Sequence, residues 1–337
     1  MIESLEIKNF TCFEDIKIDF VPGINIFIGD NGTGKTHILK LLYTIPSSKT
    51  KVSKDETGYI DEISYLLEVE SIFLSESNAL TRKSSSKKEE IKKFVLIFNI
   101  DGKPFTVTNE QHNWLASLNC DINGVYIPAK DMLANAPYFL STYKKYDMHF
   151  EKVYADVLLN SYLPPLRKLN DRQKAWMKKI EDVIGGEIAI KGEKFFLKSE
   201  VGEIDFMLVS EGWRRLAHLW LLIRCGLLDQ GTELCWDEPE TNLNPSMFPV
   251  LVDVLLELQE MGVQMFIATH SYYLLKRFDL QRKDHSVKFY SLYEKNKKEG
   301  VKCDPADTYL ELSHNKIDEE NEKIYDLTVE NELFKKK

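Results

Sequence analysis

The sequence GDNGTGKT, at residues 29–36, constrains the fold more than any other stretch, because it fits the pattern GxxxxGK[ST]. An isoleucine-rich run, INIFIG, leads into it, and HILKLLY follows it with apolar residues at helical spacing. Glycines in such a loop let backbone N–H groups curl around a phosphate at the start of a helix. Since strand, loop and helix occur in the order that the pattern requires, we interpret the segment as a P-loop rather than a chance glycine-rich loop.

The P-loop predicts which residues hold a nucleotide, taken here to be ATP with Mg²⁺. Lys35 is expected to reach the β- and γ-phosphates, and the Thr36 hydroxyl is expected to ligate Mg²⁺. The residues predicted to bind the nucleotide are Gly29, Asp30, Asn31, Gly32, Thr33, Gly34, Lys35, Thr36 and His37.

Two further apolar strands end in residues suited to phosphate chemistry. ELCWDE ends in Asp237, predicted to bind Mg²⁺ through water, and Glu238, predicted to polarise the attacking water. IATHS contains His270, predicted to donate a hydrogen bond to the γ-phosphate. The plainer interpretations are two acids before a proline turn and a structural histidine with its own partner. Together with the P-loop, the patterns predict a catalytic site of Lys35, Glu238 and His270.

Strand and helix patterns alternate along the chain and predict an α/β fold with a mainly parallel sheet and an antiparallel N-terminal β part. The first half is expected to hold a hairpin at 2–20, strands at both ends of 61–98 (ISYLLEVESIFL and KKFVLIFNI), a strand at 124–128 and helices over 135–184 broken at Pro164 and Pro165. The second half is expected to hold strands over 188–208, a helix at 216–228, a strand at 233–237, a helix at 245–261, a strand at 263–268, one or two strands (VKFYSLYE, TYLEL) and a charged tail. Residues 81–93 are polar and charged, and read as a loop or hairpin tip or as a basic patch for nucleic acid.

Composition limits the class of protein. The chain has 337 residues and 43% hydrophobic content, enough to fill a large core. It carries no run long enough for a membrane span and no basic-then-apolar start, so a cytoplasmic protein without membrane contact is expected. Its five scattered cysteines lack CxxC spacing and predict neither disulfides nor a zinc site. A net charge of −9 disfavours indiscriminate binding to DNA, although it does not exclude a local basic face.

The order of the motifs resembles that of the ABC-type ATPases of the SMC, RecF and OLD group. The matching segments are the opening IESLEIKNFTCFEDIKIDF, the P-loop, SEGW at 210–213, WDEPE at 236–240, NLNP at 242–245 and ATHS at 268–271. The resemblance covers about the first 45 residues and about residues 184–278. It implies an ABC-type P-loop ATPase head: an N-terminal lobe at 1–130, an inserted, mostly helical lobe at 131–187, a C-terminal lobe with signature, Walker B and switch histidine at 188–283, and C-terminal strands with a charged tail at 284–337.

The resemblance also implies that two copies share each nucleotide, as a homodimer or higher homo-oligomer with ATP at the interface. Ser210 and Gly212 of one copy would then contact the γ-phosphate held by the P-loop of another, while Ser210 as a simple helix N-cap is the plainer interpretation. The pattern departs from the family at Glu211, where a glycine is usual, and at Trp213, where a glutamine is usual.

Other polar residues have weaker assignments. Gln111 is a candidate for the Q-loop glutamine, and Lys130 is another residue that could approach the nucleotide. Arg214 and Arg215 are interpreted as partners for phosphates or for acids of a second subunit, or else as a solvated first helical turn.

The chain between Lys35 and Ser210 is too short for the long coiled-coil arms of SMC proteins. The second, acid-rich catalytic domain of OLD nucleases is not expected after Ser271. We therefore expect an ATPase subunit that gates a separate effector, a nuclease or toxin, in bacterial anti-phage defence. The alternative is a DNA-repair or chromosome-maintenance ATPase that binds DNA, and a transporter subunit comes third.

Overall fold

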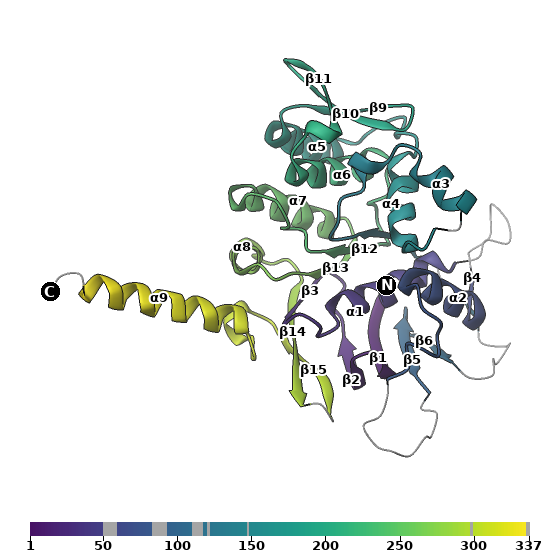
Figure 1. Cartoon of the computed structure of the whole chain (residues 1–337), viewed down its shortest axis with the longest axis vertical. Helices are drawn as coiled ribbons and strands as arrows, with labels where there is room; N and C mark the ends of the chain where they lie inside the picture. Colours follow the sequence, from purple (N-terminus) through teal and green to yellow (C-terminus); the bar gives the residue numbers. More distant parts are fainter. Residues whose placement is uncertain are drawn as a thin grey trace.

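A six-stranded sheet in the order β15-β14-β3-β13-β12-β8 forms the centre of the protein (Figure 1). The structure, a computed structural model, describes residues 1–49, 59–82, 93–109, 117–119, 122–146, 148–296 and 299–334. The strands of the central sheet are β3 (Ile24–Gly29), β8 (Asn123–Ile127), β12 (Thr232–Asp237), β13 (Gln264–Ala268), β14 (Val287–Asn296) and β15 (Gly300–Ala306). Neighbouring strands run parallel except β14 and β15, which pair antiparallel. The prediction of a mainly parallel sheet is confirmed.

Side chains from the two faces of this sheet feed two separate hydrophobic cores. In β13, Met265 and Ile267 belong to one core, whereas Phe266 and Ala268 belong to the other. Strands that are buried on both faces read as continuous apolar runs, which explains INIFIG and MFIA. The helices α6 (Glu211–Arg224), α7 (Phe248–Glu260) and α8 (Tyr272–Gln281) supply the first core, and α1 (Lys35–Ser47) supplies the second.

An antiparallel sheet in the order β2-β1-β5-β6 completes the core around α1. Its strands are β1 (Ile2–Phe10), β2 (Phe13–Asp19), β5 (Val95–Ile100) and β6 (Lys103–Thr108). The predicted N-terminal hairpin is confirmed, since Phe10 pairs with Phe13 across a turn in which Thr11 has φ 48°. The expected strand at KKFVLIFNI is confirmed as β5.

The expected strand at ISYLLEVESIFL is wrong, because this segment forms helix α2 (Glu62–Phe73). Several of its apolar residues are β-branched or aromatic, which favours a strand. The buried apolar residues, however, recur at helical spacing: Tyr65, Leu66, Val69 and Ile72. The Asp61 carboxylate accepts a hydrogen bond from the Ser64 amide (2.9 Å) and caps the helix. A short strand, β4 (Tyr59–Asp61), precedes α2 and pairs with β7 (Ser117–Asn119). Most of the charged stretch at 81–93 lies outside the described residues, so both interpretations of it stay predictions. Gln111 also lies outside the described residues.

The predicted helices of the middle region are present as α3 (Phe139–Tyr146), α4 (Lys152–Ser161) and α5 (Asp171–Ile184), after the 3₁₀ turn η1 (Leu133–Asn135). Pro164 and Pro165 lie between α4 and α5, where the break was expected. The expected strands that follow are β9 (Glu187–Lys191), β10 (Lys194–Ser199) and β11 (Gly202–Asp205), an antiparallel sheet that leads to the 3₁₀ turn η2 (Phe206–Leu208). The division of the chain into lobes stays a prediction.

Two boundaries differ from expectation. Helix α6 begins at Glu211 and ends at Arg224, instead of running over 216–228, because Gly226 turns the chain with φ 70°. The helix expected at 245–261 is α7, preceded by the 3₁₀ turn η3 (Pro245–Met247).

The C-terminal part holds one correction. VKFYSLYE forms β14 as expected, but TYLEL is not a strand: it forms the 3₁₀ turn η4 (Tyr309–Glu311), which Thr308 and Glu311 close with a capping box. The charged tail forms a helix, α9 (Lys316–Phe334), which extends away from the body (Figure 1). No helix of the described residues is long and apolar enough to cross a membrane.

Candidate nucleotide-binding site

The P-loop connects β3 to α1 and depends on backbone conformations that favour glycine. Gly29, Gly32 and Gly34 have φ values of 146°, 81° and 88°. A Cβ atom on Gly34 would lie 2.4 Å from the Phe13 ring, so a larger residue would displace the loop from the first hairpin. No heavy atom lies within 4 Å of a Cβ position on Gly32, which leaves the loop backbone open to a ligand on that side.

Lys35 is the first residue of α1, and its side chain folds back over the loop. Its ammonium group donates hydrogen bonds to the carbonyl oxygens of Gly29 (2.8 Å) and Asp30 (3.0 Å). Burial lowers the pKa of Lys35 to about 8, against the opposing effect of Asp237 and Glu238. A cation that is only 6% exposed is well placed to bind an anion that excludes water.

Thr36 and Asp237 meet although they lie 201 residues apart: the Thr36 hydroxyl donates to Asp237 Oδ2 (2.8 Å). Burial raises the pKa of Asp237, which is 7% exposed, to about 6, although the bond from Thr36 and the charge of Lys35 oppose this rise. A hydroxyl and a carboxylate side by side are hard oxygen ligands, so the pair fits Mg²⁺, which takes its other ligands from phosphate and water.

Glu238 follows β12 directly and has a positive φ of 49°. Its amide donates to the Ala268 carbonyl (2.8 Å), and its carboxylate accepts a hydrogen bond from the Thr241 hydroxyl (3.0 Å). The ring of His270 lies beside it, with Nε2 3.9 Å from Glu238 Oε1. Burial and the nearby Lys35 lower the pKa of His270, so the imidazole is neutral at pH 7.

One pocket of about 240 Å³ collects most of the predicted site. Its walls include Asn31, Gly32, Gly34, Lys35, Thr36, His37, Asp237, Glu238 and His270. His37 is turned partly toward the first hairpin, since its Nδ1 lies 3.0 Å from the Thr11 hydroxyl, and burial lowers its pKa to about 4.

Asp30 and Thr33, two other predicted residues of the P-loop, line a second pocket that shares Asn31 and Gly32 with the first. Thr33 is buried and donates through its hydroxyl to the Asp30 carbonyl (2.8 Å). The Asp30 carboxylate forms an ion pair with Lys316 at the start of α9. Ser210 and Gly212 are not among the residues that line the pocket within this copy.

Ser210 stands exposed at the first turn of α6. The described chain contains no hydrogen bond from its side chain to the backbone of this helix, so the capping role is not realised. Gly212, two residues on, is buried, and a Cβ atom there would lie 2.3 Å from the Asn242 carbonyl oxygen. Glycine therefore lets α6 lie directly on the segment that follows Glu238.

The two arginines after the signature do not form a solvated first turn, which corrects that interpretation. Arg214 Nε lies 2.5 Å from Asp131 Oδ2, and its Nη1 donates to two carbonyls of the preceding loop. Arg215 is only 3% exposed and reaches the Pro128 carbonyl (3.5 Å), while its Nε and Nη2 have no hydrogen-bond partner among the described residues. Both arginines tie α6 to the segment after β8, from which the exposed Lys130 points outward.

Glu240 is a site residue to which the sequence analysis assigned no role. Its carboxylate accepts hydrogen bonds from the Thr269 hydroxyl (2.6 Å) and the His270 amide (2.9 Å). Burial raises the pKa of Glu240, and the bond from Thr269 opposes this rise. The signal in the sequence that could have indicated this role is a third acid, two residues after Glu238 in the segment WDEPE.

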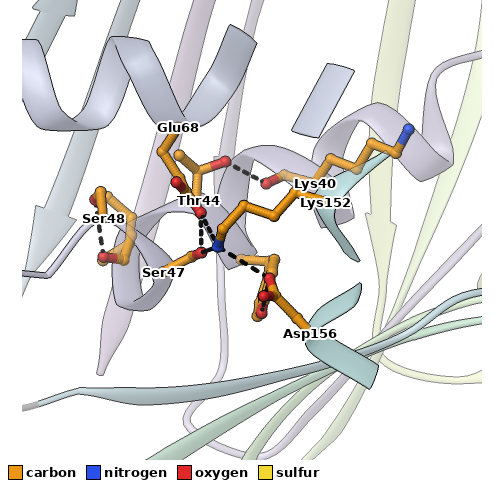
Figure 2. A network of polar contacts seen from close by, with 9 residues as sticks. Lys40, Thr44, Ser47, Ser48, Glu68, Lys152 and Asp156 are labelled. Carbon is orange, nitrogen blue, oxygen red and sulfur yellow. Dashed lines mark hydrogen bonds and ion pairs between the residues drawn. The ribbon is translucent and has the colours of Figure 1, made fainter. Parts of the chain in front are cut away.

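A polar network anchors the far end of α1 (Figure 2). The Lys152 ammonium of α4 lies 3.0 Å from the Ser47 hydroxyl, 2.5 Å from Glu68 of α2 and 3.0 Å from Asp156. Nearer the P-loop end of α1, the Lys40 ammonium forms an ion pair with Glu151 (2.7 Å). The helix that begins at the P-loop is therefore tied to the middle helical region by ion pairs.

Comparison with known proteins also indicates an ATPase domain. Residues 1–113 match the family model "AAA ATPase domain", and residues 124–276 match "AAA domain, putative AbiEii toxin, Type IV TA system". The chain is 41% identical over 49 residues to the DNA replication and repair protein RecF of Lactococcus lactis subsp. cremoris (strain MG1363), covering 14% of each chain. It is 23% identical over 208 residues to the protein of the same name from Ligilactobacillus salivarius, covering 58% of this chain and 51% of that one.

The chain thus spans about half or less of the length of these curated relatives. Among solved structures, an SMC head bound to the C-terminal winged-helix domain of ScpA superposes with a TM-score of 0.53 at 12% identity, covering 92% of this chain and 99% of that one. This similarity concerns the fold.

Fold and site together define a P-loop nucleotide-binding protein with an antiparallel β part beside a mainly parallel sheet. The two AAA-domain matches and the partial similarity to RecF support an ABC-type ATPase of the SMC, RecF and OLD group.

The raised pKa of Asp237 predicts a pH dependence of stability without nucleotide. Between about pH 4 and pH 6 the Asp237 carboxyl group is ionised in the unfolded chain but still protonated in the folded chain. The free energy of unfolding therefore falls as the pH rises to about 6. Asp237→Asn should remove this decrease in the free energy of unfolding, which amounts to on the order of 3 kcal/mol above pH 6. Urea unfolding at pH 4 and pH 7 should show the variant gaining stability over wild type with rising pH. The exposed Asp284→Asn serves as the control, and an equal gain there contradicts the prediction.

Proposed function

We propose that the chain is an ATPase that binds ATP with Mg²⁺ in the pocket between the P-loop, Asp237 and His270, and hydrolyses it with Glu238 as the catalytic residue. The observation that carries this proposal is the meeting of Lys35, Thr36, Asp237, Glu238 and His270 in one small pocket, although they come from separate segments of the chain. Both family models are ATPase or AAA domains, which supports this activity at the level of the family.

In the proposed mechanism Lys35 transfers its hydrogen bonds from the loop carbonyls to the β- and γ-phosphates. The glycine-rich backbone offers further N–H donors at the helix start. The Glu238 carboxylate, oriented by the Thr241 hydroxyl, accepts a proton from the attacking water. The neutral His270 donates a hydrogen bond to the γ-phosphate as negative charge develops. Mg²⁺, held by Thr36 and Asp237, would neutralise the phosphate oxygens.

We propose that a second copy completes the site. Ser210 is exposed at the N-terminal end of α6, where the helix dipole favours an anion. Gly212 allows close approach at the same end of the helix. Two copies placed head to tail would set the Ser210 of each against the γ-phosphate of the other, as a homodimer or as the unit of a larger homo-oligomer.

We further propose that this ATPase is cytoplasmic and gates a separate effector, a nuclease or toxin, in anti-phage defence. Support comes from the second family model, whose description names a putative AbiEii toxin of a toxin–antitoxin system. An effector would respond to ATP only if it binds one nucleotide state more tightly than the other.

A second candidate is an ATPase that binds DNA in replication or repair. It is supported by the matches to RecF, whose printed name is DNA replication and repair protein. In that case the ATP-bound dimer would be the DNA-binding form.

Substitutions in the pocket should separate binding from hydrolysis. Lys35→Ala removes the cation that grips phosphate and should weaken ATP binding about 10- to 100-fold. Glu238→Gln should keep ATP binding but lower the hydrolysis rate by about 100-fold or more, since it removes the proton acceptor. ATP binding is measured by calorimetry and hydrolysis by phosphate release, with the exposed Lys17→Ala as the control. Wild-type hydrolysis in Glu238→Gln would refute the assignment.

The shared site makes a mixing prediction. Lys35→Ala and Ser210→Arg proteins should each be inactive alone, because every site of either homodimer lacks one component. In an equal mixture half of the dimers are hybrids with one intact site of two, so about a quarter of wild-type activity should return. Full activity of Ser210→Arg alone would contradict a role in the partner's site.

The two biological roles predict different behaviour of the isolated chain. An effector-gating ATPase should hydrolyse ATP, leave DNA and RNA uncut, and hydrolyse at the same rate with or without DNA. A RecF-like ATPase should bind duplex DNA with ATP more tightly than without it, with an affinity that falls as salt rises. Gel shifts and phosphate release with Glu238→Gln as the non-hydrolysing control distinguish the two. Metal-dependent cleavage that survives in Glu238→Gln would overturn the gating role.

A further inference from the structure

The outer half of α9 packs on no other described part of its own chain (Figure 1). Every side chain over residues 322–331 is exposed, including the apolar Ile324 (55%), Tyr325 (69%) and Leu327 (58%). A single helix of this length is marginally stable in water without tertiary contacts. Exposed apolar residues on such a helix point to a partner surface.

The charge of α9 restricts what that partner can be. The helix sequence holds seven carboxylates and only two lysines. Two copies of α9 packed on each other would bring like charges together, which is unfavourable. The matching surface must therefore be apolar with basic groups.

A groove of about 900 Å³ is lined by apolar side chains and by four basic residues against two acids, Glu181 and Glu187. It lies between α5, the C-terminal end of α6 and β9, and its lining includes Tyr162, Leu166, Met177, Trp220, Lys198 and Arg224. The Arg224 guanidinium stacks over the Trp220 ring at 5.3 Å from its centroid, which holds a cation at the edge of an apolar surface. Lys198 is exposed and has no ion-pair partner among the described residues.

We propose that α9 of one copy docks in this groove of a second copy, an inference that rests on the proposed head-to-tail dimer. The root of α9 is fixed beside the P-loop by the ion pair between Lys316 and Asp30. In that dimer the P-loop of one copy faces Ser210, the start of the other copy's α6, and the groove lies at the far end of that helix, at Arg224.

The lengths of the two helices agree with this arrangement. The 14 residues of α6 span about 21 Å and the 19 residues of α9 span about 28 Å at 1.5 Å per residue. Counted from Lys316, Ile324 and Leu327 lie about 12 and 17 Å along α9. Trp220, which lines the near part of the groove, lies about 15 Å from Ser210 along α6, so these residues can reach it. Asp326, which lies between them, and the flanking Glu322 and Glu330 would face Lys198 and Arg224.

A native cysteine makes the docking testable in the full-length chain. Cys225 is free and lines the groove, and Leu327 is an exposed position at which cysteine should not disturb folding. Leu327→Cys in a Glu238→Gln background, with ATP and a short bismaleimide cross-linker, should give a covalent dimer. The band should disappear when Cys225→Ser is added, and it should be absent from the parent without Leu327→Cys.

Charge reversal supplies the second measurement. Lys198→Glu should lower the cross-linking yield about fivefold, because it places a carboxylate opposite an acidic helix. The matched Lys103→Glu, also an exposed lysine on an antiparallel strand but outside the groove lining, should leave the yield unchanged.

The outcomes separate the docking from the dimer itself. Mass photometry with ATP first establishes whether a dimer forms. If a dimer forms but gives no cross-link, or gives a cross-link that survives Cys225→Ser, the docking is overturned and the shared nucleotide site still stands. A chain that stays monomeric in ATP overturns both. Equal loss of yield in Lys198→Glu and Lys103→Glu also contradicts the docking.

Discussion

Parallel pairing of three buried strands is the constraint on which the site depends. In register, Phe27 of β3 pairs with Ala268 of β13, and Ala268 pairs with Asp237 of β12. The carboxyl ends of these strands therefore meet at one edge, and the next residues of each chain segment emerge side by side. A P-loop alone can bind phosphate, but this register is what brings the Glu238 carboxylate and the His270 imidazole to the pocket beside the P-loop.

The parts of the site that follow directly from a strand end could be predicted from sequence. Lys35, Asp237, Glu238 and His270 each lie within a few residues of an apolar run, so their place at the sheet edge needs no knowledge of the rest of the fold. The helix α2 could not be read in the same way, because its β-branched and aromatic residues favour strands when taken locally. Its helical spacing and its cap at Asp61 decided the outcome.

The sequence analysis named Gly212 and Arg214 but missed the contacts that they make across elements, for a physical reason. Gly212 matters because of a carbonyl at Asn242, and Arg214 because of a carboxylate at Asp131, and neither partner is near in sequence. A pair of arginines on a helix reads as solvated by default, since burying them requires acceptors that only the folded chain supplies. The lobes predicted for the chain likewise cannot be read from burial alone, because helices α5 and α6 belong to the same core as the central sheet.

Glu240 joins two loops that would otherwise move separately. It belongs to the segment after β12, yet its carboxylate holds the Thr269 hydroxyl and the His270 amide of the segment after β13. The segment that carries Glu238 and the segment that carries His270 are therefore joined by two hydrogen bonds to one carboxylate. If Glu238 and His270 act in the proposed hydrolysis, a movement of either segment would carry the other with it, because both are bonded through Glu240.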